Sequence, residues 1–312
     1  SLSGESHSLT PDVLLDEAGP SPLLQARLDA LQHGHAPGAW SGNIRQEGGL
    51  RGAFAAGSQY TAASLLAGHD ARLGPRWLLG TAVGQTLGHL QFDRGGGRAQ
   101  IETIPMELAL LREAGPSYAA ATASHRRSRI ITDRPLDVAD GQVHRAYSRR
   151  EARTTHLRLE TGRTWATDQG RWVPFAALGH DRIQSDAFAE RGNTGFELAV
   201  ADAAQWRTYA DVGVRYLRHW PGRTGSGWLL DISGHRRSVL DASDGSPQAA
   251  FTGMPDATFA LGDGALDRDQ TLLTLRLLGQ GGRSWWWYAD YRDARGGLLP
   301  ARSGQVGIVV PF

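Results

Sequence analysis

The chain has 312 residues, with 33 basic and 32 acidic side chains and a formal net charge of +1. This balance excludes a partner held by bulk positive charge, so we expect no nucleic-acid binding. The absence of cysteine excludes disulfide bonds and thiolate metal sites. The sequence contains no run of about 18 apolar residues, so no transmembrane helix is predicted.

The first 37 residues differ from the rest and contain the one predicted helix, over residues 21–31. Ser21 can cap its N-terminus and Pro22 suits the first turn, while leucines recur on one face. The helix residues expected to contact their surroundings are Leu24, Arg27, Leu28, Asp29 and Leu31. The first residues carry no signal segment, so we expect the chain to come from a longer precursor.

From Ala39 onward the sequence reads as β-strands separated by turns. The mean hydropathy of −0.36, with 40 Gly and 10 Trp, is typical of a membrane barrel in which alternate residues meet lipid. Residues 206–216 show the pattern, with aromatic-ended apolar positions on one face and charges on the other. About twelve strands are predicted, an even number, and several exceed the length usual in soluble sheets. They lie near 39–48, 58–70, 76–90, 98–112, 117–131, 150–166, 170–183, 205–220, 226–238, 270–280, 284–294 and 303–312.

Alternation assigns charges of both signs to the face opposite the apolar one. Because opposite charges recur on neighbouring strands, we expect ion pairs that stabilise a hollow barrel. The same lining would hold the helix and keep the pore hydrated. The predicted lumenal charges are Glu107, Arg158, Glu160, Asp211, Arg215, Asp231, His235, Arg276, Asp290 and Arg292.

The predicted connections fall into two classes. Residues 168–170, 222–225 and 280–283 form short turns, whereas 129–149, 180–204 and 240–269 are long and polar. Short turns on one rim and long loops on the other are typical of outer-membrane barrels.

The last eight residues, 305–312, form a predicted strand with two unlike faces. Val306, Ile308, Val310 and Phe312 make the apolar face. An apolar stripe that ends on an aromatic suits the last strand of an outer-membrane barrel. From this segment alone, a buried strand of a soluble sandwich is the alternative.

In combination these features resemble the translocator (β) domain of a monomeric type Va autotransporter. The resemblance rests on the helix directly before the first strand, the number of strands, the segments 251–261 and 264–269 before the last three strands, and the terminal Val-Gly-Ile-Val-Val-Pro-Phe. It covers nearly the whole chain. Residues 2–17 are similar to the junction that follows subtilisin-like passengers in this family, whereas the Asn-Asn pair at which another branch cuts itself is absent from the helix.

The resemblance implies an all-β fold: a transmembrane antiparallel β-barrel of about 12 strands with the N-terminal helix inside its lumen. It divides the chain into a linker with the lumenal helix (1–37) and the barrel (38–312). The implied function is type V secretion of the chain's own N-terminal passenger across the outer membrane of a Gram-negative bacterium, by a monomer without a cofactor. The implied partners are outer-membrane lipids, the passenger, and the barrel assembly machinery, which would recognise Phe312.

The rival hypothesis is a stand-alone outer-membrane enzyme or pore of the omptin protease class. Asp231 and His235 share a strand face, but about 13 Å of strand separates them, too far for a direct dyad. No G-x-S-x-G motif and no pair of His at metal-ligand spacing on a helix occurs. We therefore expect no catalytic, cofactor-binding or metal-binding residues, while the passenger could be an enzyme, such as a serine protease.

Overall fold

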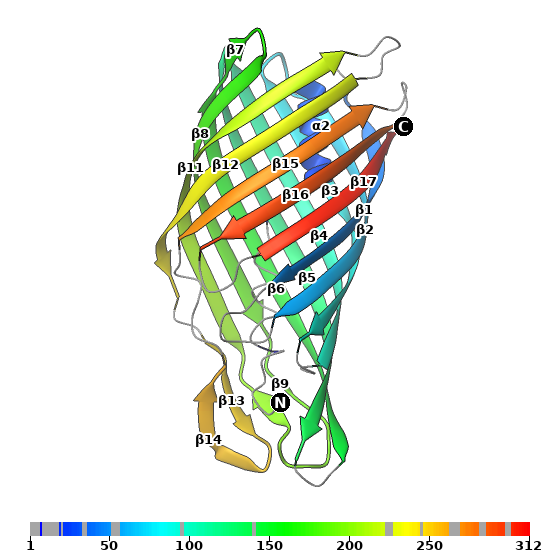
Figure 1. Ribbon diagram of the computed structural model, residues 1–312, viewed down its shortest axis with the longest axis vertical. Coiled ribbons are helices and arrows are strands. Elements are labelled where there is room, and N and C mark those ends of the chain that lie inside the picture. The colour runs from blue at the N-terminus through cyan, green and yellow to red at the C-terminus, as the bar shows by residue number, and fades with distance from the viewer. Residues whose placement is uncertain are drawn as a thin grey trace.

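The computed structural model describes residues 7, 19, 21–32, 36–50, 57–93, 97–138, 142–221, 227–243, 246–261, 269–280, 285–296 and 301–312. Within them, twelve antiparallel strands follow one another around a closed ring (Figure 1). The ring consists of β1 (Ala39–Leu50), β2 (Ser58–Arg72), β3 (Trp77–Phe92), β4 (Gly97–Ala114), β5 (Ser117–Asp137), β6 (Val143–Arg163), β8 (Gly170–Ser185), β11 (Ala203–Pro221), β12 (Gly227–Ala242), β15 (Gln270–Gln280), β16 (Trp286–Arg295) and β17 (Ala301–Pro311).

The ring closes between its first and last strands. Trp40 of β1 pairs with Pro311 of β17, and the register continues to Leu50 opposite Ala301. A short strand, β7 (Trp165–Thr167), pairs with the start of β8. The predicted antiparallel barrel of about twelve strands is therefore confirmed.

The wall has an apolar outer surface. The exposed side chains alternate with buried ones along the strands, as in β4, and many of the exposed ones are large and apolar. They include Leu65, Val83, Met106, Leu159, Leu178, Val212, Leu275, Val306 and Ile308. An apolar surface facing outward and a polar one facing inward is the reverse of a soluble protein, so the soluble-sandwich alternative is wrong.

The helix α2 (Pro22–Gln32) lies inside this ring (Figure 1). It contacts β2 and β3 and is followed by β1. In the described part of the chain, no helix is long and apolar enough to cross a membrane.

A second, four-stranded sheet lies beyond the barrel at the end where the long connections gather (Figure 1). Its strands are β9 (Phe188–Ala189), β10 (Leu198–Val200), β13 (Gln248–Phe251) and β14 (Met254–Ala260). Leu198, Val200, Ala249 and Leu261 form its small apolar core. Residues 251–261, one of the segments on which the family resemblance rests, therefore contain the turn and the second strand of the β13–β14 hairpin.

One predicted loop is wrong. Residues 129–149 were expected to form a long polar connection, but β5 continues to Asp137 and β6 begins at Val143. The two strands pair through Asp137 opposite Val143. Arg and Asp occupy both faces of this extension, so the apolar–polar alternation that marks a strand in the bilayer is lost there. Of the predicted short turns, 222–225 and 281–283 lie outside the described residues.

Candidate functional site: the lumen and its helix

The N-terminus of α2 is fixed to the wall by a buried carboxylate. Ser21 donates hydrogen bonds from its backbone N–H and its hydroxyl to Oε2 of Glu107, at 2.9 and 2.7 Å. The Ser21 hydroxyl also accepts a bond from the backbone N–H of Leu24, as a helix cap does. Arg126 of β5 donates to Glu107 at 3.3 Å and to the carbonyl of Gly19 at 2.7 Å. Negative charge is thus held at the positive end of the helix and is itself neutralised.

The middle of the helix is held by an ion pair that water does not reach. Nε and Nη2 of Arg27 donate to the two carboxylate oxygens of Asp70 on β2, at 2.7 and 3.1 Å. Both side chains are almost completely buried. Asp70 also accepts a bond from the backbone N–H of Gly38, where the chain turns from the helix towards β1. One carboxylate therefore fixes both the helix and the chain that leaves it.

Further contacts join α2 to β15 and, a second time, to β2. Arg276 of β15 donates to Gln25 at 2.8 Å and to Asp290 of β16 at 3.1 Å. Arg72 of β2 donates to the backbone carbonyl of Leu31. The helix is thus tied to the wall at several places around its circumference.

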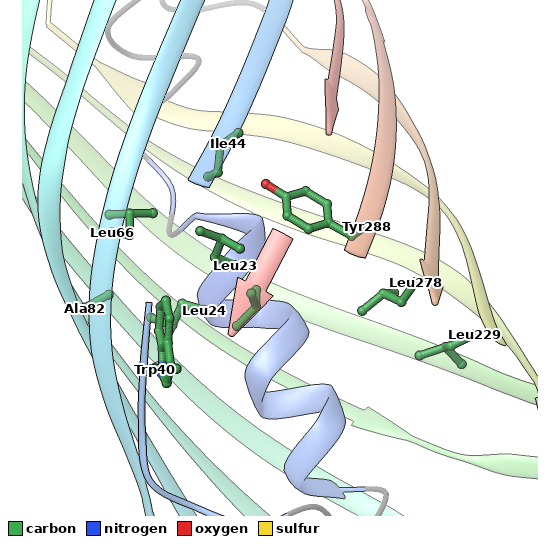
Figure 2. Close-up of a cluster of buried hydrophobic side chains, with 11 residues drawn as sticks. Leu23, Leu24, Trp40, Ile44, Leu66, Ala82, Leu229, Leu278 and Tyr288 are labelled. Atoms are coloured by element: carbon green, nitrogen blue, oxygen red, sulfur yellow. The ribbon is translucent and has the colours of Figure 1, made fainter. Parts of the chain in front are cut away.

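Apolar packing completes the seat of the helix. Figure 2 shows Leu23 and Leu24 of α2 among Trp40, Ile44, Leu66, Ala82, Leu229, Leu278 and Tyr288 from the wall. Gly80 of β3 makes room for the helix, because a Cβ there would lie only 2.7 Å from Cδ1 of Leu24. Leu28 packs against this cluster and against a second one that contains Leu31. The helix leucines predicted from the sequence therefore face the barrel wall.

A second group of charges surrounds the open part of the lumen. Arg158 of β6 pairs with Glu160 at 2.8 Å and with Asp211 of β11. Arg215 lies 3.8 Å from Glu160 and 3.7 Å from Asp231. Arg158, Glu160, Arg215 and Arg276 line a cavity of about 450 Å³ beside Leu28 of the helix. The lumen is thus partly filled by α2 and otherwise bordered by paired charges.

The ten residues predicted to carry lumenal charges all lie on strands whose alternation turns these side chains towards the inside of the barrel. Besides the pairs above, His235 lies 3.7 Å from Asp211. Arg292 lines a smaller cavity together with Glu107 and Ser21. The side chain of Asp29 lies outside the described residues. The role of these charges in export stays a prediction.

Several lumenal residues escaped the sequence analysis. Asp181 of β8 lies 2.6 Å from His156 and 2.9 Å from Arg207, from the strands on either side of it. Strand alternation places all three on the inner face and could have found them. The sequence contains no signal for the ion pair of Arg27 with Asp70, because the spacing of the leucines does not determine which wall residues the helix faces.

His7, which precedes the helix in the sequence, is also held at the far end of the barrel. His7 is completely buried, and its Nε2 lies 2.8 Å from Oε1 of Glu190, between β9 and β10. Arg134 of the β5 extension donates to both oxygens of Glu190, and Arg150 of β6 donates to the carbonyl of His7 at 3.5 Å. We call His7, Arg134, Arg150 and Glu190 the rim clasp.

The rim clasp shifts the protonation of its two titratable groups outside the barrel strands. Burial lowers the pKa of His7 to about 4, and the nearby Arg150 and Arg134 add to this against the opposing effect of Glu190. Burial alone would raise the pKa of Glu190, but hydrogen bonds from His7 and Arg134 outweigh it and lower that pKa to about 2. At neutral pH the clasp therefore contains a neutral imidazole and an ionised carboxylate.

The rival constellation for catalysis does not assemble. Asp231 interacts with Arg215, whereas the carboxylate near His235 is Asp211 at 3.7 Å. Across the described ranges, no group of three or more His, Asp or Glu side chains is placed to hold a metal ion.

Comparisons with known proteins match this geometry. The autotransporter beta-domain family model matches residues 39–292. Among solved structures, the translocator domain of autotransporter NalP from Neisseria meningitidis is similar, with a TM-score of 0.74 and 16% identity over 100% of this chain and 99% of that one. The beta domain of the Bordetella autotransporter BrkA has a TM-score of 0.58 and 16% identity over 89% of this chain and 100% of that one. The transport unit of the autotransporter AIDA-I from Escherichia coli has a TM-score of 0.52 and 10% identity over 99% of each chain. A comparison with curated proteins gave no match.

The matched segment runs from the first residue of β1 into β16, so it spans most of the ring. The solved structures show that the chain shares their fold, and the family match identifies its role as that of an autotransporter beta-domain. The chain belongs to the autotransporter beta-domain family and is an outer-membrane translocator of type V secretion in a Gram-negative bacterium.

Proposed function

We propose that this barrel exports its own N-terminal passenger through the lumen that α2 occupies, and that residues 1–37 are the last part of the exported chain. The observation that carries the proposal is the path of the chain. His7 is clasped at the end with the long connections, α2 lies in the lumen, and β1 starts at the opposite rim (Figure 1). A chain whose passenger has left through the barrel must follow this path.

The lengths of the connections between strands support the direction of export. The long-connection end carries the second sheet, whereas short turns such as 115–116 and 168–169 close the other end. In outer-membrane barrels the long loops face outward and the short turns face the periplasm. His7 would therefore lie at the cell surface and Ala39 near the periplasm.

The inner surface suits transport of an unfolded segment. Its charges are paired with one another or with the helix, so few isolated charges are available to trap a passing chain. The contacts of Asp70 and Glu107 would form once the final segment reaches the lumen. As a translocator the barrel is not itself the catalytic part, and any enzymatic activity would belong to the passenger. Residues 2–17, which resemble a subtilisin-passenger junction, suggest a serine protease.

The proposed partners follow from the outer surface. The exposed apolar wall fits outer-membrane lipids, and the exposed face of β17 fits recognition by the barrel assembly machinery. One closed ring is complete in one chain, so a monomer is sufficient as the export unit. The rival function as an omptin-like enzyme has no supporting observation.

Surface display tests the proposal. An unstructured epitope would be joined to Ser1, behind a signal sequence, and protease would be added to intact cells. We expect the epitope to be cleaved from outside while the barrel stays folded, as judged by its heat-dependent gel mobility. An epitope that remains protected in cells with folded barrel would overturn export through this lumen. A control chain without residues 39–312 should leave the epitope in the periplasm.

A further inference from the structure

A row of arginines crosses the outer surface of the barrel towards the end with the long connections. Arg127 of β5, Arg153 of β6 and Arg182 of β8 are all exposed, and their three strands are neighbours in the wall. Strand alternation turns these side chains outward, because residues next to them in sequence, such as Thr154 and Ile183, are buried. We call Arg127, Arg153 and Arg182 the arginine row.

The strand register brings the members of the arginine row close together. Arg127 pairs directly with Arg153 across β5 and β6. Across β6 and β8, Arg153 pairs with Gln184 and Thr155 pairs with Arg182, so Arg153 and Arg182 are diagonal neighbours. Direct neighbours lie about 5 Å apart and diagonal ones about 7–8 Å apart, within reach of long side chains. Like charges at this spacing repel, so the row favours an anion between its guanidinium groups.

The nearby acidic side chains neutralise only part of the arginine row. Glu151 accepts two hydrogen bonds from Arg127, at 2.7 and 3.2 Å. Glu151 also attracts Arg153, and Asp186 attracts Arg127, both at longer range. Across the described ranges, Arg153 and Arg182 donate no hydrogen bond to a carboxylate. Their guanidinium groups, with five N–H donors each, are therefore available to a bound anion.

Further arginines continue this surface away from the middle of the barrel. Arg129 of β5 and Arg149 of β6 are exposed, and Arg129 contacts Glu102 of β4 at 3.4 Å. Asp133, farther out, is already paired with two other arginines, Arg98 and Arg145. Five outward arginines thus surround three carboxylates: Arg127, Arg129, Arg149, Arg153 and Arg182 against Glu102, Glu151 and Asp186. The excess of positive charge calls for an anionic partner.

The arginine row lies at the outer edge of the apolar band that a barrel presents to lipid. Arg127 follows the first residue of β5 by ten positions, and Arg153 precedes the last residue of β6 by ten. Arg182 follows the first residue of β8 by twelve. Ten positions correspond to about 33 Å of strand and about 25 Å of depth at the usual tilt, which equals the height of the band. Since β5 and β8 begin and β6 ends at the short-turn end, the row lies level with the headgroups at the opposite end.

Large apolar side chains lie directly on the membrane side of the arginine row. Ile104 of β4 pairs with Arg127 and is exposed. Leu157 of β6 and Leu178 of β8 are exposed as well, each two outward positions nearer the middle of the membrane than the arginine of its strand. A ligand at this place therefore meets cations at one end and an apolar wall at the other, which is the chemistry of a lipid with an anionic headgroup.

We propose that the arginine row binds a headgroup phosphate of lipid A, the phosphorylated glycolipid of the outer leaflet, with the acyl chains lying against Ile104, Leu157 and Leu178. Guanidinium groups bind phosphate through paired N–H donors. A phosphate monoester carries up to two negative charges and matches the excess positive charge better than a singly charged diester does. The placement in the outer leaflet rests on the proposed function, which directs the long connections outward. Binding to the purified barrel needs no export, so the two proposals can fail separately.

A lipid titration tests the arginine row. The detergent-refolded chain would be mixed with lipid A, and the lipid-bound fraction would be read by native mass spectrometry. The double variant Arg153→Gln/Arg182→Gln should bind about tenfold or more weakly than the parent chain, because two phosphate-binding cations are lost. The matched control Arg163→Gln/Arg218→Gln removes two exposed arginines at the short-turn end and should leave the affinity unchanged. Heat-dependent gel mobility checks that each variant is folded. No loss in the first variant, or equal loss in both, would overturn the proposal.

Varying the lipid tests the chemistry of the ligand. Dephosphorylated lipid A keeps the acyl chains, phosphatidylglycerol carries a phosphate diester, and inorganic phosphate has no acyl chains. Lipid A should bind about tenfold or more tightly than each of them, because only lipid A combines a phosphate monoester with acyl chains. Undiminished binding of dephosphorylated lipid A would overturn the role of phosphate, and equal binding of phosphatidylglycerol would overturn the preference for lipid A. Displacement of lipid A by an equal concentration of inorganic phosphate would show a free-anion site and overturn the lipid.

Discussion

Arg27 of the lumenal helix and Asp70 of β2 form a two-point ion pair, with N–O distances of 2.7 and 3.1 Å, from which water is excluded. The pair joins residues 43 positions apart, and Asp70 also accepts a hydrogen bond from the backbone N–H of Gly38, just before β1. Removing one partner of such a pair leaves the other buried and uncompensated. Asp70 is therefore a wall residue on which retention of the helix depends.

Asp70→Asn should loosen the helix without opening the ring. Because Arg27 would stay buried without its counter-charge, helix docking should weaken by about 3–5 kcal/mol. The expected result is frequent current openings in planar bilayers, with normal heat-dependent gel mobility. Asp256→Asn, at an exposed position of β14, is the matched control and should leave the current quiet. Identical current traces from Asp70→Asn and Asp256→Asn would contradict a role of the ion pair in holding the helix.

Gly80 and Leu24 should be energetically coupled. Gly80→Val would crowd Leu24 and cost about 1–3 kcal/mol of helix docking, and Leu24→Ala would cost about 2–5 kcal/mol through lost packing. In the double variant the valine occupies space vacated by the leucine, so the combined loss should be clearly smaller than the sum. Protease susceptibility of the helix segment in detergent measures this, and strictly additive losses would contradict the contact.

Acid should release the rim clasp. The pKa of His7 falls from its ordinary 6.5 to about 4 on docking, so the released state binds a proton that the docked state does not. Docking is then fully favourable above pH 6.5 and loses up to about 3 kcal/mol as pH falls towards 4. Glu190, whose pKa is lowered to about 2, adds a further loss below pH 4.5.

Hydrogen exchange of peptides that cover residues 186–200 measures this release. Protection should fall as pH drops from 6.5 to 4, after correction for the intrinsic exchange rate. His7→Phe should abolish the pH dependence above pH 4.5 and keep the part due to Glu190. A profile that is flat in the parent chain would contradict the buried, neutral His7.

Phe312 should matter for assembly and not for stability. Its side chain is 80% exposed, so Phe312→Ala removes little packing. If the exposed face of β17 is read by the assembly machinery, the variant should give several-fold less folded barrel in cells, yet refold normally from urea into detergent. Val306→Ala, on the same face, is a milder companion. Equal yields in cells would remove the recognition role of Phe312.

Much of the barrel was accessible from the sequence because lipid and lumen demand opposite chemistry at alternate residues. The pattern in 206–216 located β11, and the leucines of residues 24–31 located the helix face. The β5–β6 extension was missed because its buried face carries polar side chains such as Arg134 and Ser148, so no apolar–polar alternation marks it. The small sheet was missed because β9, β10 and β13 have only two to four residues, and because β14 is exposed along nearly its whole length and shows no alternation.

The site was predicted to the level of which face each charge occupies, and no further. Arg158 with Asp211 joins strands that are not adjacent along the chain, so spacing alone could not identify the pair. The seat of the helix depends on Gly80 and Asp70, whose roles arise only once α2 is placed against β2 and β3. The rim clasp joins His7 to Glu190, 183 positions away.

The most direct test of the central claim is the conductance of the barrel with and without residues 1–37. The intact chain and a chain starting at Gly38 would be refolded in the same detergent, matched for heat-dependent gel mobility, and inserted into planar bilayers. With the helix filling the lumen, the shortened chain should fold and conduct several-fold more than the intact one. Equal conductance from two folded barrels would contradict a lumenal helix.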